Sequence, residues 1–217
     1  MTQIVATLVD HMGSDLSVVN AARVSFKKKS DWVTDQDGHV YLSKADVGLI
    51  RYLAEHKHMS PFGHAFVSFH IKAPIFVARQ LVKHKFLRWN EVSRRYVDDT
   101  PEFFYPDTWR GRATNKKQGS EGEVDVTGTI NMSGFHLTIG AAYEALLEDG
   151  VAPEQARMIL PQSTMTEWYW SGSLDAFADM CKLRLKDDTQ YETRLVAQQI
   201  SEQMDKLFPY SWEQLIK

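Results

Sequence analysis

The residues best suited to chemistry in this sequence lie between Arg79 and Tyr96, where cations, amides, a carboxylate, a hydroxyl and a phenol occur together. Residues 79–95 hold six of the chain's 25 lysines and arginines and one of its 28 acids, so the segment carries +5 and the remaining chain −8. The planar guanidinium of arginine donates paired hydrogen bonds to phosphate, and amide and apolar side chains beside it suit a base or a flavin ring. The pattern indicates either a site for an anionic nucleotide or cofactor, or a solvated loop joined to a helix end.

Periodic apolar residues predict the elements that must position this segment. A helix beginning at Pro74 and ending near Phe86 would carry Arg79 and Lys83 four residues apart on one face. Its last turn would be cationic, and positive charge at that end of a helix interacts favourably with the helix dipole. A polar turn at residues 90–96 follows. Alternating apolar residues predict strands at residues 64–72 and 164–170. Further helices are expected at residues 16–26, 43–54, 130–147, 153–161, 173–186 and 189–208.

Length and element order together bound the fold. The 217 residues are 43% hydrophobic and 24% charged, which fits a globular domain and excludes wholesale disorder. Few strands among many helices, without regular βαβ alternation, predict an α+β fold in a single catalytic domain over residues 1–217. Residues 110–128 contain four glycines and little apolar periodicity, so we expect a flexible excursion there. The sequence has neither a G-x-G-x-x-G nor a G-x-x-x-x-G-K-[ST] motif, so any nucleotide must be held without these loops.

Composition also bears on location and partners. The net charge of −3 opposes a protein whose whole surface binds nucleic acid. No segment has the roughly 20 apolar residues needed to cross a bilayer, and the first residues do not resemble an export signal. The single cysteine, Cys181, cannot form an internal disulfide, which suits a reducing compartment. We therefore expect a cytoplasmic protein that binds neither nucleic acid nor membrane.

Two other functions are suggested by the same residue types. His56, His58, His64 and His70 are potential metal ligands, but the H-E-x-x-H spacing and a carboxylate base are missing, so no metal site is expected. The basic segment is interleaved with aromatic residues and would suit single-stranded nucleic acid on a non-enzymatic protein. The acidic remainder of the chain opposes that alternative.

The basic segment also contains a specific motif. Lys83-His84-Lys85 is followed by seven residues and then Ser93, with Asn90-Glu91 and Arg95-Tyr96 at fixed positions around it. This pattern resembles the signature R-H-R-x7-S of flavin-dependent thymidylate synthases. Segments at residues 20–26, 58–64, 69–80 and 156–161 are also similar to family sequence, so the resemblance spans most of residues 8–208.

The resemblance implies an enzyme that converts deoxyuridylate (dUMP) to thymidylate (dTMP). In this family methylenetetrahydrofolate donates the carbon, FAD carries the hydride, and NADPH reduces the flavin. No enzyme cysteine attacks the pyrimidine ring, so Cys181 is expected to be a buried, inert thiol. The resemblance further implies a helix-rich domain with a small antiparallel sheet, in a homotetramer whose active sites lie between subunits.

Matching positions imply three sets of site residues. The substrate-binding set is Arg79, Gln80, Glu91, Ser93, Arg94, Arg95, Arg157 and Arg184. The cofactor-binding set is Ser25, His58, Ser60, Lys83, His84, Lys85, Glu91, Ser173 and Asp179. The catalytic set is Ser93, Arg184 and Glu91. We expect Ser93 to bind rather than attack, because no His/Asp pair adjoins it in sequence to activate its hydroxyl.

Several positions depart from the family pattern. Lys83 and Lys85 replace arginines, which keeps the charge and loses the planar fork. Larger changes are Arg88 in place of a small polar residue, Arg94 in place of glycine, Gly63 in place of a carboxylate, and Ser173, Asp175 and Asp179 in place of Asn, Arg and Asn. Because these changes cluster on the flavin side, one alternative is a diverged flavin enzyme that modifies another pyrimidine nucleotide such as dCMP, or transfers the one-carbon unit at another oxidation level.

Overall fold

The computed structural model describes residues 3–114, 119–126 and 128–217. The strands are β1 (Val5–Met12), β2 (Val33–Thr34), β3 (Val40–Tyr41), β4 (Phe66–Pro74), β5 (Arg88–Glu91), β6 (Arg110–Arg112), β7 (Ser120–Glu123) and β8 (Met165–Ser173). The α-helices are α1 (Asp15–Arg23), α2 (Lys44–Glu55), α3 (Ile75–Leu81), α4 (Met132–Glu148), α5 (Pro153–Ala156), α6 (Leu174–Arg184), α7 (Tyr191–Leu207) and α8 (Pro209–Ile216). Short 3-10 helices are η1 (Val24–Phe26), η2 (Ser60–His64) and η3 (Arg157–Ile159).

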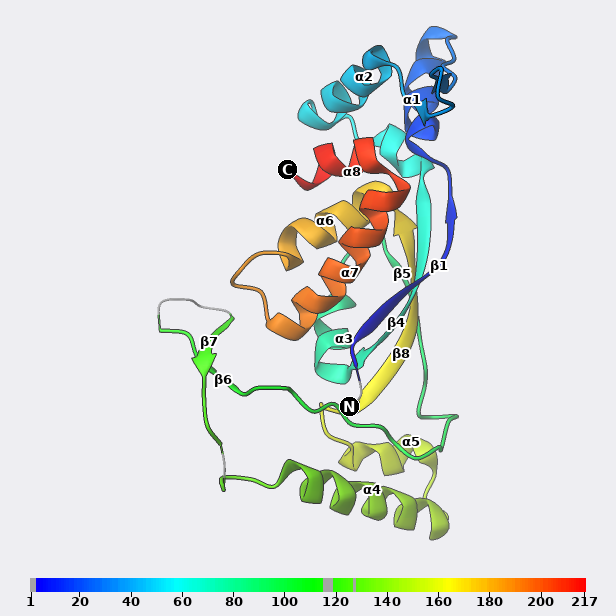
Figure 1. Ribbon diagram of the computed structural model, residues 1–217. Coiled ribbons are helices and arrows are strands. Elements are labelled where there is room, and N and C mark those ends of the chain that lie inside the picture. Colours follow the sequence, from blue (N-terminus) through cyan, green and yellow to red (C-terminus); the bar gives the residue numbers. More distant parts are fainter. Residues whose placement is uncertain (1–2, 115–118, 127) are drawn as a thin grey trace.

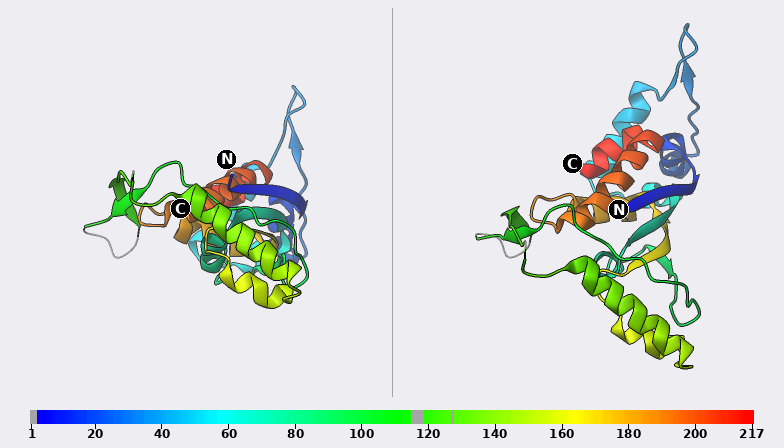
Figure 2. Two further views of the ribbon diagram at one scale, coloured as in Figure 1. Left: turned by 90° about the horizontal axis from the view of Figure 1, so that it is seen from below. Right: turned by 60° about the horizontal axis from the view of Figure 1, so that its bottom comes forward.

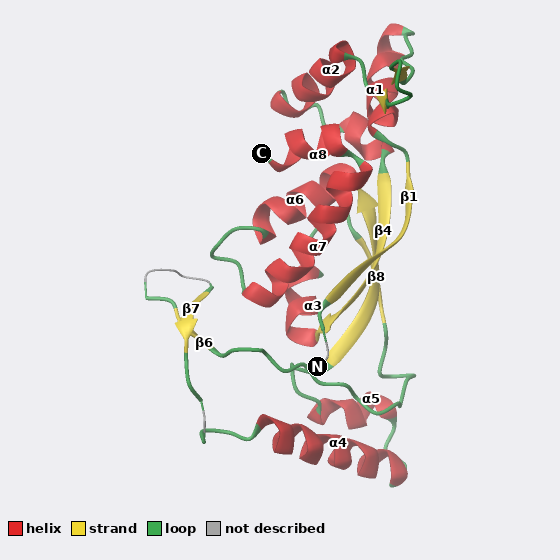
Figure 3. Cartoon of the chain, in the orientation of Figure 1, coloured by secondary structure: helices red, strands yellow, loops and turns green. Residues whose placement is uncertain are grey.

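A four-stranded antiparallel sheet in the order β1-β4-β8-β5 forms the centre of the fold. Figures 1 and 3 show α3, α6 and α7 on one side of this sheet, α1 and α2 toward one end, and α4 and α5 toward the other. The hairpins β2–β3 and β6–β7 project from this body (Figure 2). The α+β class and the small antiparallel sheet are therefore confirmed.

Large aromatic side chains of β4 and β8 form the core between the sheet and the helices. Trp168 and Trp170 are each 1% exposed, and Phe69 of β4 lies opposite Trp170. Phe177 of α6 packs edge-on against both Phe69 and Trp170, with ring centroids 5.3 and 5.6 Å apart. Such ring pairs stabilise packing beyond the area that they bury, so they fix how α6 lies on the sheet.

The opposite face of the same strands is polar. The Ser68 and Ser171 hydroxyls form a hydrogen bond of 2.8 Å between β4 and β8. Further along the two strands, one oxygen of the Glu167 carboxylate lies 3.1 Å from His70 Nε2 and the other lies 3.6 Å from Lys72 Nζ. Alternate residues of a strand point to opposite faces, so β4 and β8 each contribute one apolar and one polar surface.

Helix α3 is shorter than predicted. It ends at Leu81, not near Phe86. Phe86 has a φ of +67°, a left-handed conformation that turns the chain toward β5. The basic triplet at residues 83–85 therefore lies in a loop after the helix, and the prediction that it forms a cationic last turn is wrong.

The predicted polar turn at residues 90–96 is partly a strand. Asn90 and Glu91 belong to β5, which pairs with β8 so that Glu91 lies opposite Trp168. The turn begins after Glu91, where the Tyr96 N–H donates to the Ser93 carbonyl at 2.9 Å. The four residues of β5 include one apolar side chain, Trp89, which is too little alternation to indicate a strand, and the available backbone of β8 decides the conformation.

The other predicted elements are present with shifted ends. Both predicted strands are found, as β4 and β8, and α2 begins after Ser43, whose hydroxyl accepts from the Asp46 N–H at 3.2 Å. Ser173 precedes α6 as expected, but its side chain makes no capping hydrogen bond. Strand β1 and helix α8 were not predicted.

The predicted excursion at residues 110–128 contains the hairpin β6–β7. Arg110 ties this hairpin to α7 through an ion pair with Glu192, and its Nε donates to Ser120 Oγ at 2.9 Å. Residues 115–118 and 127 lie outside the described residues, and flexibility of the excursion stays a prediction. None of the helices within the described ranges is both long and apolar enough to cross a membrane.

Close packing between β8 and the loop before β5 provides a test of the fold. A Cβ at Gly172 would lie 2.3 Å from Leu87 Cδ2 and 3.3 Å from the Phe86 carbonyl oxygen. We expect Gly172→Ala to lower the free energy of unfolding by about 1–3 kcal/mol in urea titrations, because Leu87 must shift. Gly48→Ala is the control, since a Cβ there meets nothing within 4 Å and an added methyl in α2 changes stability by between zero and about +1 kcal/mol. Equal stability of Gly172→Ala and the unchanged protein would contradict this packing.

Candidate functional site

A cleft of about 860 Å³ lies beside the end of β5 and the beginning of β8. Its walls include residues of α3, of the turn after β5 and of the α5–η3 segment. Six predicted site residues line it: Arg79, Glu91, Ser93, Arg94, Arg95 and Arg157. The structure thus gathers residues that are far apart in the sequence, and we refer to this space as the arginine cleft.

The turn after β5 sets Ser93 beside Arg95. The Val92 N–H donates to the Glu167 carbonyl at 2.9 Å and so extends the pairing with β8. The Ser93 hydroxyl then accepts from the Arg95 Nε at 3.3 Å and from the Arg95 backbone N–H at 3.4 Å. These partners are donors and cannot take a proton from the hydroxyl, so the geometry suits a binding group better than a nucleophile.

Glu91 is held in place by its strand neighbours. One carboxylate oxygen accepts from the Thr166 hydroxyl at 2.9 Å, and the other accepts from the Trp89 indole N–H at 3.2 Å. The Trp89 ring stacks on Trp168 with 4.3 Å between centroids. The Arg79 guanidinium lies 3.9 Å from Glu91. The carboxylate therefore has a fixed orientation at the wall of the arginine cleft.

Arg95 and Arg157 are the cations of the cleft that are available to a ligand. Three other acids of the cleft are paired: Asp99 lies 3.3 Å from Arg94, Glu102 lies 2.8 Å from Lys72, and Glu167 lies 3.6 Å from Lys72. Both Arg95 and Arg157 are exposed, and in the part of the chain that the structure describes neither forms an ion pair. With the Ser93 hydroxyl beside them, these guanidinium groups can bind an anion such as phosphate.

A second cavity of about 690 Å³ borders the adjacent face of α3. Arg79 lines the arginine cleft and Gln80 lines this cavity, because successive positions on a helix differ in direction by about 100°. Lys83 and Arg184 also line it. We refer to this space as the helix-side cavity. Three of the predicted site residues, Gln80, Lys83 and Arg184, line it.

Arg184 is fixed at the wall of the helix-side cavity. Its Nε donates to His84 Nε2 at 2.9 Å, and its Nη2 donates to the Gln80 carbonyl at 3.3 Å. Arginine offers no acceptor, so His84 Nε2 must be unprotonated and the ring hydrogen must lie on Nδ1. Burial, assisted by the Arg184 charge, lowers the pKa of His84 to about 4. Near neutral pH the imidazole is therefore uncharged.

The Gln80 amide lies between residues at the beginning of α7. Its Nε2 donates to Gln190 Oε1, and its Oε1 accepts from the Thr193 hydroxyl at 3.2 Å. Gln190 donates in turn to Glu192 at 3.3 Å. Sequence reasoning missed Gln190, Thr193 and the Glu91 partner Thr166, because their roles follow from which elements pack together and no local pattern marks them.

The remaining predicted cofactor residues lie elsewhere on the chain. Ser25, His58 and Ser60 are exposed in or beside η1 and η2, Ser173 ends β8, and Asp179 is exposed on α6. Lys85 is exposed beside Phe86. None of these six residues lines the arginine cleft or the helix-side cavity. A single chain therefore does not bring most of the cofactor-binding set into the same space as the substrate-binding set.

Large aromatic side chains are exposed next to two of these cofactor positions. Phe26 follows Ser25 and is 76% exposed, and Phe86 follows Lys85 and is 84% exposed. An exposed ring beside a hydroxyl or a cation suits the flat, partly charged flavin. This combination fits a flavin-binding surface.

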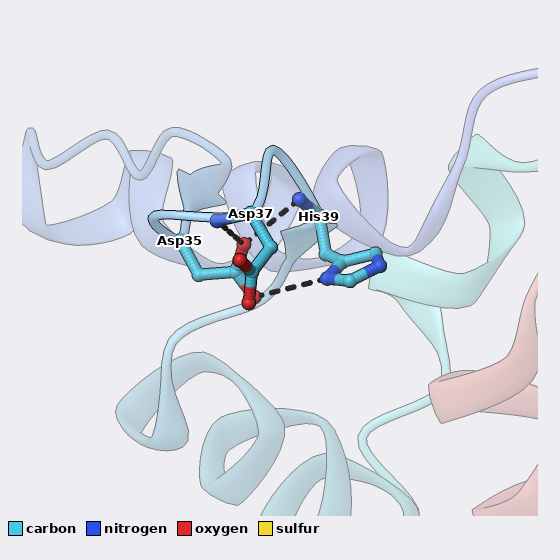
Figure 4. Close-up of side chains that lie close together, drawn as sticks. All are labelled: Asp35, Asp37 and His39. Carbon is cyan, nitrogen blue, oxygen red and sulfur yellow. Dashed lines mark hydrogen bonds and ion pairs between the residues drawn. The ribbon is translucent and has the colours of Figure 1, made fainter.

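Among the described residues, one group of side chains is close enough to share a metal ion: Asp35, Asp37 and His39 (Figure 4). All three are exposed. The Asp35 carboxylate accepts from the Asp37 and His39 backbone N–H groups at 3.0 and 2.9 Å, so it closes the turn between β2 and β3. This structural role accounts for the cluster.

Cys181 is fully buried in α6, as predicted. Burial raises the pKa of its thiol, and the Sγ donates to the Ala197 carbonyl at 3.7 Å. The thiolate is the reactive form of cysteine, so this side chain is inert in the folded protein.

Known proteins resemble this chain in sequence and in structure. The family described as thymidylate synthase complementing protein matches residues 7–210. A flavin-dependent thymidylate synthase of Thermus thermophilus is 40% identical over 206 residues, covering 94% of this chain and 73% of that protein. One from Kosmotoga olearia is 38% identical, covering 95% and 87%. Among solved structures, the UMP/dUMP methylase PolB from Streptomyces cacaoi, bound with 5-Br dUMP, has a TM-score of 0.83 and 32% identity, covering 98% of this chain and 94% of that one.

The neutral state of His84 predicts how stability depends on pH. The unfolded chain binds a proton at the ordinary histidine pKa of 6.5, whereas the folded chain binds it only near 4. Between these values the unfolded state holds more protons, so the free energy of unfolding should fall as the pH is lowered from 6.5 to 4. His84→Gln keeps an acceptor for Arg184 and cannot titrate, so its stability should fall less over this range in urea titrations. Parallel pH profiles for the two proteins would contradict the burial of a neutral His84.

Proposed function

We propose, since the chain belongs to the thymidylate synthase complementing protein family, that it is a flavin-dependent thymidylate synthase. The reaction is the reductive methylation of dUMP to dTMP. Methylenetetrahydrofolate is the carbon donor, and FAD reduced by NADPH is the hydride carrier. The observation that carries the proposal is the arginine cleft, in which Arg95, Arg157 and the Ser93 hydroxyl are available to an anion, while Asp99 and Glu102 of the same cleft are paired with other cations.

The arginine cleft is proposed to bind the nucleotide. Arg95 and Arg157 hold the phosphate from two walls, and Ser93 adds a hydroxyl next to Arg95. Arg79 and Glu91 lie at the same wall, 3.9 Å apart. Glu91 is fixed by Thr166 and Trp89, so it presents a carboxylate of constant position to the ring that is transformed. A preorganised group needs little rearrangement during a reaction.

The flavin is proposed to bind to the set containing Ser25, His58, Ser60, Lys83, His84, Lys85, Ser173 and Asp179. When bound, it supplies hydride transfer to the pyrimidine. The lysines provide positive charge, which stabilises the negative charge of a reduced flavin. His84 is uncharged near neutral pH and contributes its Nδ1–H as a donor. The exposed Phe26 and Phe86 rings offer apolar area beside these polar groups.

The separation of the two sets supports active sites between subunits. Ser25, His58 and Ser60 lie near α1 and α2, whereas Arg157 lies beside α5, toward the other end of the sheet (Figure 1). We therefore propose a homotetramer in which neighbouring chains bring the flavin and nucleotide residues together. Gln80 and Arg184 of the helix-side cavity belong to the substrate set in this arrangement. The protein is further proposed to be cytoplasmic.

UMP is a second candidate substrate. The solved structure of PolB is described as that of a UMP/dUMP methylase and has been obtained with 5-Br UMP as well as 5-Br dUMP. The contacts proposed for the arginine cleft are to phosphate and do not distinguish ribose from deoxyribose. Comparing turnover of UMP, dUMP and dCMP at equal concentration identifies the nucleotide.

The direct test is a visible spectrum followed by reduction and turnover. We expect the purified protein to bind FAD, NADPH to bleach the flavin absorbance under anaerobic conditions in a nucleotide-dependent way, and dTMP to form when methylenetetrahydrofolate and dUMP are added. Failure to take up FAD supplied in excess would overturn the proposal. Binding to single-stranded DNA that weakens steeply with salt, without flavin, would favour the nucleic-acid alternative.

Arg95 is expected to contribute to nucleotide binding and not to flavin binding. We expect Arg95→Ala to weaken dUMP binding by about 10- to 100-fold, the loss of a charged hydrogen bond, as measured by calorimetry. The FAD content should stay near that of the unchanged protein. Arg112→Ala, an exposed arginine of β6 that lines neither cavity, is the control and should alter neither quantity. Equal loss of FAD and dUMP in Arg95→Ala would contradict the division of the site.

A further inference from the structure

The segment between Ser93 and Thr100 is fixed by few contacts of its own. Backbone hydrogen bonds to β8 hold it at both ends, from the Val92 N–H to the Glu167 carbonyl at 2.9 Å and from the Met165 N–H to the Glu102 carbonyl at 2.8 Å. Between these anchors the chain makes a turn in which Tyr96 and Val97 donate to the Ser93 carbonyl. Residues 95–100 are all exposed. Other contacts must therefore decide where this turn lies.

Arg94 supplies such contacts. Its Nη1 donates to the Asp99 carbonyl at 2.8 Å and lies 3.3 Å from the Asp99 carboxylate, so it closes the loop on itself. The guanidinium carbon lies 5.9 Å from the centroid of the Tyr143 ring, within the range of a cation–π contact. Tyr143 is fully buried in α4. The Arg94 side chain is 15% exposed, against 62% for Arg79, so it is packed rather than free in the cleft.

A second contact joins the same loop to the same helix. The Thr100 hydroxyl donates to Glu144 at 3.0 Å, and Glu144 follows Tyr143 on α4. Helix α4 also packs against α5 and η3, the segment that carries Arg157. Arg94 therefore links the wall of the arginine cleft that holds Ser93 and Arg95, through α4, to the wall that holds Arg157.

We propose that Arg94 is a positioning residue: with Asp99 and Tyr143 it forms a latch that sets the distance between the Ser93–Arg95 wall and the Arg157 wall, and it does not itself bind the nucleotide. The proposal rests on the proposed function for the identity of the ligand. It also changes the role of Arg94, which the sequence placed among substrate-binding residues. A latch that holds the two walls in a fixed position lowers the ordering cost of binding.

The latch is tested first without any ligand. Arg94→Met keeps the aliphatic stem and removes the guanidinium. Amide hydrogen exchange at Tyr96 and Val97, whose N–H groups donate to the Ser93 carbonyl, should therefore become at least several-fold faster in nucleotide-free protein. Tyr143→Phe keeps the ring and removes only a hydroxyl that has no partner among the described residues, so exchange in this segment should be unchanged. Unchanged exchange in Arg94→Met would overturn the latch.

The second test separates positioning from direct binding. Arg94→Met should weaken dUMP binding about tenfold and raise KM more than it lowers kcat, with Arg94→Lys partly restoring affinity. In an Arg95→Ala background the added effect of Arg94→Met should be small, because both changes act through the same contact. Fully additive effects would show that Arg94 contacts the nucleotide itself and would overturn the proposal. If the unchanged protein binds no dUMP, the proposed function fails, while the exchange measurement still decides whether the latch exists.

Discussion

The pairing of β5 with β8 is the contact on which both cavities depend. At one end of this four-residue strand, Glu91 lies opposite Trp168 and the next residues turn to place Ser93 beside Arg95. At the other end, Leu87 packs against Gly172 and fixes the loop that carries Lys83 and His84 next to Arg184. A shift of β5 by one residue would exchange the faces of all four side chains. One short edge strand therefore sets the geometry of two binding surfaces.

Cations of the basic segment are divided between the two cavities. Arg79, Arg94 and Arg95 line the arginine cleft, whereas Lys83 lines the helix-side cavity. Acids in the cleft neutralise some of its cations and leave others available. A surface of this kind favours a small anion over a long polyanion, because a polyanion gains affinity from many evenly spread cations.

The class of fold and six residues of the arginine cleft could be predicted from the sequence, because alternating apolar residues identify β4 and β8 and the motif around Ser93 is specific. The length of α3 could not, since the left-handed Phe86 and the pairing of β5 depend on contacts with β8. The same holds for Gln190 and Thr193, which reach Gln80 only because α7 packs against α3. The sequence position of Arg94 placed it in the substrate-binding set, but no local sequence pattern indicates its contact with Tyr143 on α4.

The indole of Trp89 joins the core to the cleft. It stacks on the buried Trp168, and its N–H donates to the Glu91 carboxylate, so its ring senses the electric field at that oxygen. An anion that enters the arginine cleft changes this field. The energy of the indole excited state depends on such fields, which means that the protein carries its own optical reporter of cleft occupancy. Tryptophan emission can then follow ligand entry in real time without any added dye.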